Sequence, residues 1–160
     1  MPVIRRLNPG EAALYRELRL EALKESPAAF STTYEAALAR DDDSWIQQAD
    51  GSARGPDRAT FVVIAGQPAG LAAIYRDAGD TTVGELIQMW IAPEHRSGSL
   101  ASELLGALLD WAARQGFVKI RAEVTPGNQR ALRFYQKCGF RLLDSDSANE
   151  VLAIDLVPRI

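Results

Sequence analysis

The strongest constraint on the fold comes from residues 83–124, where two strand patterns flank a long amphipathic helix. Strand-forming residues fill 83–91 and 118–124. Between them an apolar stripe recurs at helical spacing: Leu100, Leu104, Leu105, Leu108, Leu109 and Ala112. Two strands joined by such a crossover helix are expected to lie parallel in one sheet. The segment therefore predicts a helix packed on a sheet with at least one parallel strand pair.

The remaining patterns extend this sheet on both sides. Strands are expected at 3–7, 61–65, 70–76, 140–143 and 151–156, and helices from Asn8 to Ser26, at 35–40, from Ser44 and at 127–138. The short turns around Gly66 and Gly79 favour an antiparallel meander. We expect one domain over residues 1–160, of α/β (α+β) class, with a mixed, mainly antiparallel sheet of six to seven strands and about four helices on its two faces.

Helix starts have candidate caps. Asn8 is expected to cap the first helix with Pro9 at its first position, and Ser44 to cap a helix after Asp41, Asp42 and Asp43. The three aspartates suit a solvated helix start better than a cation site, because no calcium-loop spacing follows them.

Composition limits the function classes. The chain has 160 residues, of which 47% are hydrophobic and 24% charged, and a net charge of −3, which suits one soluble domain and argues against nucleic acid as the main partner. No apolar run approaches the roughly 18 residues that span a bilayer. The start of the chain has no apolar stretch typical of secretion, so the cytoplasm is the expected location and no membrane partner is expected.

Metal and thiol chemistry are also disfavoured. One cysteine, Cys138, and one histidine, His95, allow neither an internal disulfide nor a Cys/His metal site, so no metal is predicted. Cys138 is expected in the core rather than as a nucleophile, because nothing near it in sequence supplies a base. His95 is expected on a surface loop.

The junction after the 83–91 strand carries the chemistry. Met89-Trp90-Ile91 is followed by the polar loop Arg96-Ser97-Gly98-Ser99, and the long helix begins directly behind it. Small residues and unpaired amides at a helix start can bind phosphate oxygens, although the same residues also make an ordinary turn and cap. The motifs for ATP and NAD fit poorly, since the lysine and the companion glycines are missing.

At this point the sequence resembles the GNAT superfamily of N-acetyltransferases. The family motif Gln/Arg-x-x-Gly-x-Gly/Ala is matched at Arg96 and Ala101, with Ser99 where the family usually has glycine. Residues 85–93 resemble the fourth strand of the family and residues 128–140 its second coenzyme-binding segment. The similarity extends to 18–23 and 26–30, whereas 51–58 has no counterpart.

The resemblance implies acetyl-coenzyme A (acetyl-CoA) as acetyl donor. Main-chain groups of Met89 and Ile91 would hold the pantetheine arm, with an amide near Ile91 facing the thioester oxygen. The implied coenzyme-binding residues are Met89, Trp90, Ile91, Arg96, Ser97, Gly98, Ser99, Leu100, Ala101, Ser102, Asn128 and Tyr135. Asn128 either contacts the pantetheine arm or caps its helix, and it can do both.

The same resemblance implies the catalytic groups. Tyr135 would protonate the leaving thiolate, the alternative being a packed aromatic residue. Glu85 would take the proton of the amine, directly or through water, with Glu123 and Asp77 as fallbacks, although many strand glutamates merely face solvent. Residues expected to line the acceptor pocket are Phe30, Thr32, Tyr34, Trp45 and Tyr75.

These features predict an N-acetyltransferase that moves an acetyl group to a primary amine by direct attack in a ternary complex. The alternative is a non-catalytic acyl-CoA-binding or sensing module of the same fold. The expected acceptor is the amine of a small molecule or of a peptide, and the sequence favours neither. The oligomeric state stays open, with a homodimer through exposed sheet edges as one option.

Overall fold

The computed structural model describes residues 1–144 and 150–156. The strands are β1 (Val3–Arg6), β2 (Arg58–Ala65), β3 (Gln67–Arg76), β4 (Val83–Ile91), β5 (Lys119–Val124), β6 (Arg141–Asp144) and β7 (Glu150–Asp155). The helices are α1 (Ala12–Glu25), α2 (Tyr34–Leu38), α3 (Asp42–Gly51), α4 (Leu100–Arg114) and α5 (Gln129–Lys137), with single 3-10 turns η1 (Pro27–Ala29) and η2 (Pro93–His95).

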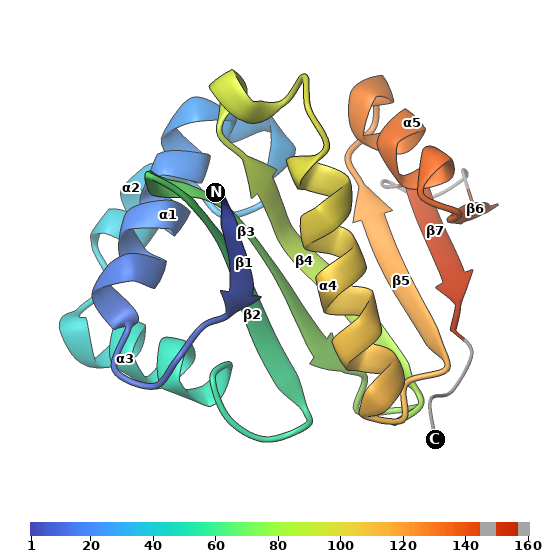
Figure 1. Ribbon diagram of the computed structural model, residues 1–160, viewed down its shortest axis with the longest axis horizontal. Coiled ribbons are helices and arrows are strands. Elements are labelled where there is room, and N and C mark those ends of the chain that lie inside the picture. The colour runs from blue at the N-terminus through green and yellow to red at the C-terminus, as the bar shows by residue number, and fades with distance from the viewer. Residues whose placement is uncertain (145–149, 157–160) are drawn as a thin grey trace.

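The seven strands form one sheet in the order β1-β2-β3-β4-β5-β7-β6 (Figure 1). The β4–β5 pair is parallel and the other five neighbouring pairs are antiparallel. The parallel pair is joined by α4, as the apolar stripe predicts. The expected mixed, mainly antiparallel sheet is therefore confirmed.

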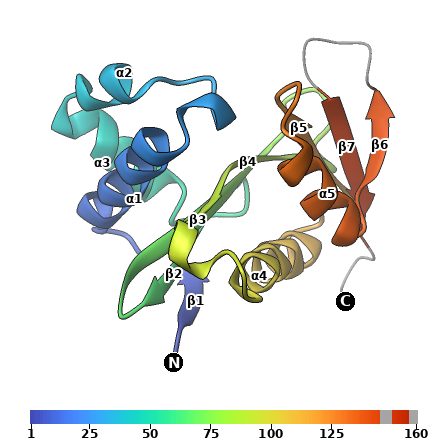
Figure 2. The same ribbon diagram turned by 90° about the horizontal axis from the view of Figure 1, so that it is seen from above.

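Helices cover the two faces of the sheet separately (Figure 2). One core contains the buried face of α4, including Leu104, Leu105 and Leu108, together with Tyr135 from α5. The other core joins α1, α2 and α3 through residues such as Tyr15 and Trp45. The sheet thus separates two layers of helices, each with its own apolar core.

Two predicted helix caps are wrong. The first helix begins at Ala12 rather than at Pro9, because the Glu11 side chain accepts hydrogen bonds from Arg5 and from the Asn8 amide, which holds the preceding residues in a turn. In α3 the cap is Asp41, whose carboxylate accepts from the Ser44 amide at 2.8 Å. The spacing of cap and amide shows that Ser44 is already inside the helix.

The strands β4 and β5 part halfway along their length. They pair only from Val83 to Leu86, opposite Lys119 to Ala122, although β4 continues to Ile91 and β5 to Val124. A β-bulge follows in β4, where Gln88 has a φ of 59° and two residues oppose one residue of β3. A bulge bends a strand and increases its twist, which carries the end of β4 away from β5. Figure 1 shows the two strands diverging.

Gly70 keeps β3 attached to this diverging end of β4. It lies opposite Ile91, and a Cβ at Gly70 would lie 2.8 Å from the Trp90 carbonyl oxygen. Only glycine therefore allows the two backbones to approach here without a shift. The end of β4 stays in the sheet on one side and is open on the other.

Candidate active site

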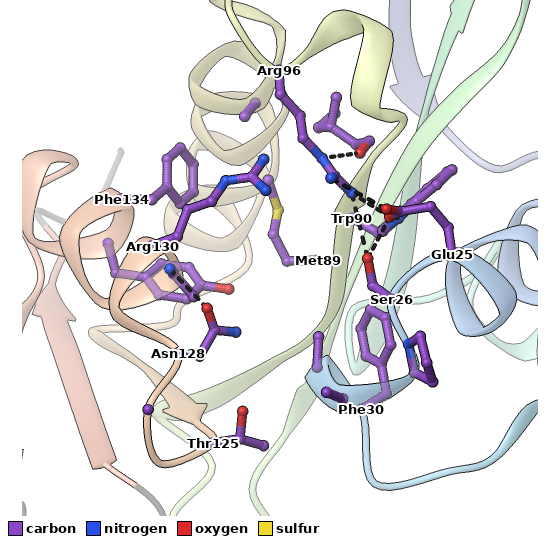
Figure 3. A pocket seen from close by; sticks show the side chains of 18 of the residues that line it. Glu25, Ser26, Phe30, Met89, Trp90, Arg96, Thr125, Asn128, Arg130 and Phe134 are labelled. Carbon is purple, nitrogen blue, oxygen red and sulfur yellow. Dashed lines mark hydrogen bonds and ion pairs between the residues drawn. The ribbon is translucent and has the colours of Figure 1, made fainter.

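A pocket of about 650 Å³ occupies the split between β4 and β5 (Figure 3). Its walls come from the end of α1 with η1, the end of β4, the start of α4, and the turn after β5 with α5. The residues that line it are Glu25, Ser26, Pro27, Ala28, Ala29, Phe30, Met89, Trp90, Ile91, Arg96, Ala101, Thr125, Pro126, Gly127, Asn128, Arg130, Ala131, Phe134 and Tyr135.

Most predicted coenzyme residues meet at this pocket. The lining includes Met89, Trp90, Ile91, Arg96, Ala101, Asn128 and Tyr135. The other five predicted residues, Ser97, Gly98, Ser99, Leu100 and Ser102, belong to the adjoining loop and first turn of α4 but do not line the pocket.

The predicted acceptor residues are more scattered. Phe30 lines the pocket, whereas Thr32, Tyr34, Trp45 and Tyr75 do not. Trp45 is 1% exposed and packs edge-on against Tyr15, with ring centroids 5.7 Å apart. Tyr75 lines a separate cavity of about 430 Å³ next to β2, β3 and α3.

The start of α4 has free main-chain donors. The Ser99 hydroxyl donates to the Glu103 carboxylate at 2.7 Å, and no side chain in the part of the chain that the structure describes caps the helix. The amides of Leu100, Ala101 and Ser102 precede the first backbone hydrogen bond of the helix, which Glu103 donates to the Ser99 carbonyl. Among residues 1–144 and 150–156 these three N–H groups, at the positive end of the helix, have no hydrogen-bond acceptor and can bind an anion.

Arg96 joins two walls of the pocket. Its Nε donates to the Ile91 carbonyl at 2.8 Å, and its Nη2 donates to Glu25 at 2.5 Å. The indole of Trp90 also donates to Glu25 at 2.9 Å, and Ser26 donates to the same carboxylate (Figure 3). The Arg96 side chain thus ties the end of α1 to the end of β4.

The same contacts change the titration of Glu25. Burial opposes ionisation, but the hydrogen bonds from Arg96, Ser26 and Trp90 outweigh it and lower the pKa of Glu25 to about 2. A lowered carboxylate pKa contributes stability above the unfolded value, near 4.5, and this contribution is lost as the pH falls through about 2.

Glu25→Gln is therefore expected to lower the free energy of unfolding at pH 7 by about 1 kcal/mol, allowing for the partial exposure of the carboxylate. The difference from the unchanged protein is expected to shrink between about pH 4.5 and pH 2. Chemical denaturation across this range measures it, with the exposed Glu17→Gln on α1 as control. A difference that stays constant with pH would contradict the assigned role of Glu25.

Tyr135 lies in the last turn of α5. It is 7% exposed, lines the pocket and packs against Phe134 and Phe140, with ring centroids 5.4 and 5.3 Å apart. Burial, and then the neighbouring Cys138, raise the pKa of Tyr135 above its ordinary value. The hydroxyl is therefore protonated at neutral pH and can act as a hydrogen-bond donor.

Asn128 both caps α5 and lines the pocket. Its side-chain oxygen accepts from the Ala131 amide at 3.2 Å. The capping role is therefore confirmed, and the amide NH₂ of the same side chain is the group left for a ligand.

Glu85 lies outside the pocket, on β4 before the bulge. Its side chain is 13% exposed and forms an ion pair with Arg121 across the β4–β5 pair, at 3.0 Å. Burial raises the pKa of Glu85; Arg121 lowers it, while Glu123 and Asp77 raise it further. The net direction is upward, so this carboxylate binds a proton closer to neutrality than an ordinary glutamate does.

Sequence reasoning missed several lining residues, notably Glu25, Ser26, Thr125, Arg130 and Phe134. Arg130 and Phe134 could have been predicted, because they lie four residues apart on α5 and directly beside Ala131 and Tyr135. The role of Glu25 could not have been predicted from its sequence neighbours, since its partner Arg96 is 71 residues away.

Other kinds of site find no support in the part of the chain that the structure describes. Within residues 1–144 and 150–156, no group of three or more His, Cys, Asp or Glu side chains gathers to hold a metal ion. Over the same ranges no helix is long and apolar enough to cross a bilayer. Burial raises the pKa of the half-buried Cys138, which does not line the pocket.

Known proteins match both the sequence and the fold. The family model described as the acetyltransferase (GNAT) family matches residues 14–140. Uncharacterised N-acetyltransferases of Mycobacterium bovis and Mycobacterium tuberculosis are 34% identical over 77 residues, which is 48% of this chain and 48% of theirs. The chain thus aligns with about half the length of the curated relatives it matches.

Solved structures extend the likeness of the fold to nearly the whole chain. A GNAT-family acetyltransferase from Streptococcus pneumoniae is 20% identical, with a TM-score of 0.82 over 98% of this chain and 100% of its own. The PaiA N-acetyltransferase of Thermoplasma acidophilum, solved in complex with coenzyme A, is 19% identical, with a TM-score of 0.72 over 98% and 99%.

Proposed function

Because the chain belongs to the acetyltransferase (GNAT) family, we propose that its split pocket binds acetyl-CoA and that the protein transfers the acetyl group to a primary amine. The observation that carries the proposal is the parting of β4 and β5, which opens a pocket between an uncapped helix start and a buried tyrosine. The amine attacks the thioester directly in a ternary complex.

The open edge of β4 suits the pantetheine arm. Beyond Leu86 the strand no longer pairs with β5. The Trp90 carbonyl faces Gly70 of β3, so the main-chain groups on the open edge are those of Met89 and Ile91. An extended ligand with two amides can bind to such an edge as an additional strand would. An amide near Ile91 then faces the thioester oxygen and stabilises the negative charge that forms on it.

The start of α4 suits the pyrophosphate. Its free amides supply donors, and Arg130, on the α5 wall of the pocket, supplies positive charge. Ser99 is compatible with this role, because its φ of −97° is ordinary for any residue and its hydroxyl is held by Glu103 on the helix. The glycine usual in the family is therefore not needed for the backbone path here.

Tyr135 and Glu85 carry out the proton transfers of the proposed reaction. The N–C bond forms first and leaves negative charge on the thioester oxygen; when the carbonyl re-forms, the C–S bond breaks and the Tyr135 hydroxyl donates its proton to the sulfur, so that coenzyme A leaves as the thiol. The second proton of the attacking nitrogen returns to the tyrosinate, directly or through water. Glu85 takes the proton that the amine must lose, directly or through water, and its raised pKa favours this role.

Glu85→Gln is expected to lower kcat/KM about 100-fold or more at neutral pH and to remove the acidic limb of its pH profile. The sign follows from the base, which must be ionised: the rate falls as the pH drops through the raised pKa of Glu85. Glu123→Gln on the neighbouring strand is the matched control. An acidic limb that survives in Glu85→Gln and disappears in Glu123→Gln would assign the base to Glu123 instead.

A non-catalytic acyl-CoA-binding module is the competing function. Such a module would bind acyl-CoA in the same pocket but would not transfer the acyl group. Release of free thiol from acetyl-CoA, measured across a broad panel of amines, therefore distinguishes the two functions. Amine-dependent release supports the transferase. Coenzyme binding without release for any amine would support the sensing module.

A further inference from the structure

Arg19 on α1 is a buried cation with an unsatisfied donor. The residue is 7% exposed, and its Nη1 is buried without a hydrogen-bond acceptor among the described residues. Its guanidinium lies 4.8 Å from the centre of the Phe30 ring, which is its clearest partner. A buried charge without an anion is costly, so its retention calls for an explanation.

A second cation and a second unsatisfied donor lie nearby. The Arg40 guanidinium stacks on Trp45 at 4.1 Å and donates to the Ser44 hydroxyl at 2.9 Å. The Trp45 indole N–H is also buried without an acceptor among the described residues. We call Arg19, Arg40 and Trp45 the donor cluster.

The pKa of Arg19 responds to its burial and to the two neighbouring polar groups. Burial lowers the pKa of Arg19, the Tyr15 hydroxyl raises it, and Arg40 lowers it. No ion pair joins Arg19 or Arg40 to a carboxylate within residues 1–144 and 150–156. The cluster therefore has donors and positive charge in excess of acceptors.

The donor cluster adjoins the pocket through Phe30. Phe30, which stacks on Arg19, also lines the pocket. Tyr15, beside Arg19, donates its hydroxyl to Gln88 at 3.0 Å, and Gln88 is the bulge residue directly before Met89. Phe30 is therefore the side chain that the cluster and the pocket share.

We propose that the acceptor amine also carries an anionic oxygen group, a carboxylate or a phosphate, which binds to Arg19 with Arg40 beside it. The proposal rests on the proposed acetyl transfer and names the acceptor class of that same site. A guanidinium can hold either group through two parallel N–H···O bonds, which fixes the orientation of the ligand. The bound oxygens supply the acceptors that the donor cluster lacks.

Matched pairs of amines test the proposal without altering the protein. Free amino acids are compared with their carboxamides, and aminoethyl phosphate with ethanolamine, by thiol release and by calorimetric binding to the protein saturated with coenzyme A. At least one anionic member is expected to exceed its neutral partner 10-fold or more in kcat/KM and in affinity. Preference for the carboxylates or for the phosphate identifies which oxyanion the site takes.

Arg19→Met gives the residue-level test. The variant is expected to lose the preference for the anionic member, to keep turnover of the neutral member, and to melt no lower than the unchanged protein, because it removes an unpaired buried charge. Arg19→Lys is expected to restore part of the preference. Arg40→Met, at a half-buried position, serves as the second variant if Arg19→Met does not fold.

Two outcomes would overturn the proposal. One is equal binding and turnover of the members of every pair. The other is an anion preference that persists in both methionine variants. If no amine releases thiol, the proposed acetyl transfer is wrong. The calorimetric comparison of anionic and neutral amines still shows whether the donor cluster binds an oxyanion.

Discussion

Replacing Tyr135 with phenylalanine is expected to lower kcat by about 10² to 10⁴ while leaving the affinity for acetyl-CoA within about twofold. The variant keeps the ring contacts to Phe134 and Phe140 and loses only the hydroxyl. Since burial holds the pKa of Tyr135 above its ordinary value, this hydroxyl is protonated throughout the neutral range and is available to the leaving sulfur. Steady-state thiol release and calorimetry measure the two effects.

Tyr34→Phe is the matched control for this result. It removes the same hydroxyl from a half-buried tyrosine on α2 that does not line the pocket, and it is expected to keep normal turnover. A Tyr135→Phe variant that turns over at the normal rate would exclude Tyr135 as the acid. A burst of acetylated Cys138 with ping-pong kinetics would contradict direct transfer altogether.

The second large effect is expected from Ala101→Glu. Ala101 lines the pocket in the first turn of α4, so the longer side chain would fill space and bring a negative charge to the proposed pyrophosphate site. Like charges at contact distance cost several kcal/mol where solvent screening is partial, so we expect acetyl-CoA affinity to fall about 100-fold or more. Calorimetric titration measures the change.

Gly106→Glu provides the control on the same helix. It introduces the same charge at an exposed position where an added Cβ meets no atom within 4 Å. Its affinity for acetyl-CoA is expected to stay close to that of the unchanged protein. Equal loss of affinity in both variants would point to general repulsion rather than to a phosphate site at the start of α4.

Much of the fold could be predicted because its signals are local. The apolar stripe of α4 and its two flanking strands specify the parallel pair, and Asn128 was recognisable as the cap of α5 from its position before a helical pattern. The first cap could not be predicted in this way, because the outcome at Asn8 depends on Glu11 binding Arg5.

Several features of the candidate site could not be predicted from local sequence patterns. The bulge at Gln88 has no sequence mark, since a positive φ is uncommon for glutamine, yet it accompanies the split that forms the pocket. The contacts of Glu25 with Trp90 and Arg96 join distant segments. Trp45 was predicted to line the acceptor pocket, but its side chain packs into the core of α1 and α3.

A crystal structure of the protein with acetyl-CoA would show directly whether the split between β4 and β5 is the coenzyme site. We expect the pantetheine arm along the open edge of β4 at Met89–Ile91, the pyrophosphate at the start of α4, and the thioester sulfur within hydrogen-bonding distance of the Tyr135 hydroxyl. Coenzyme bound on another surface, or bound in the split with its sulfur far from Tyr135, would contradict this expectation.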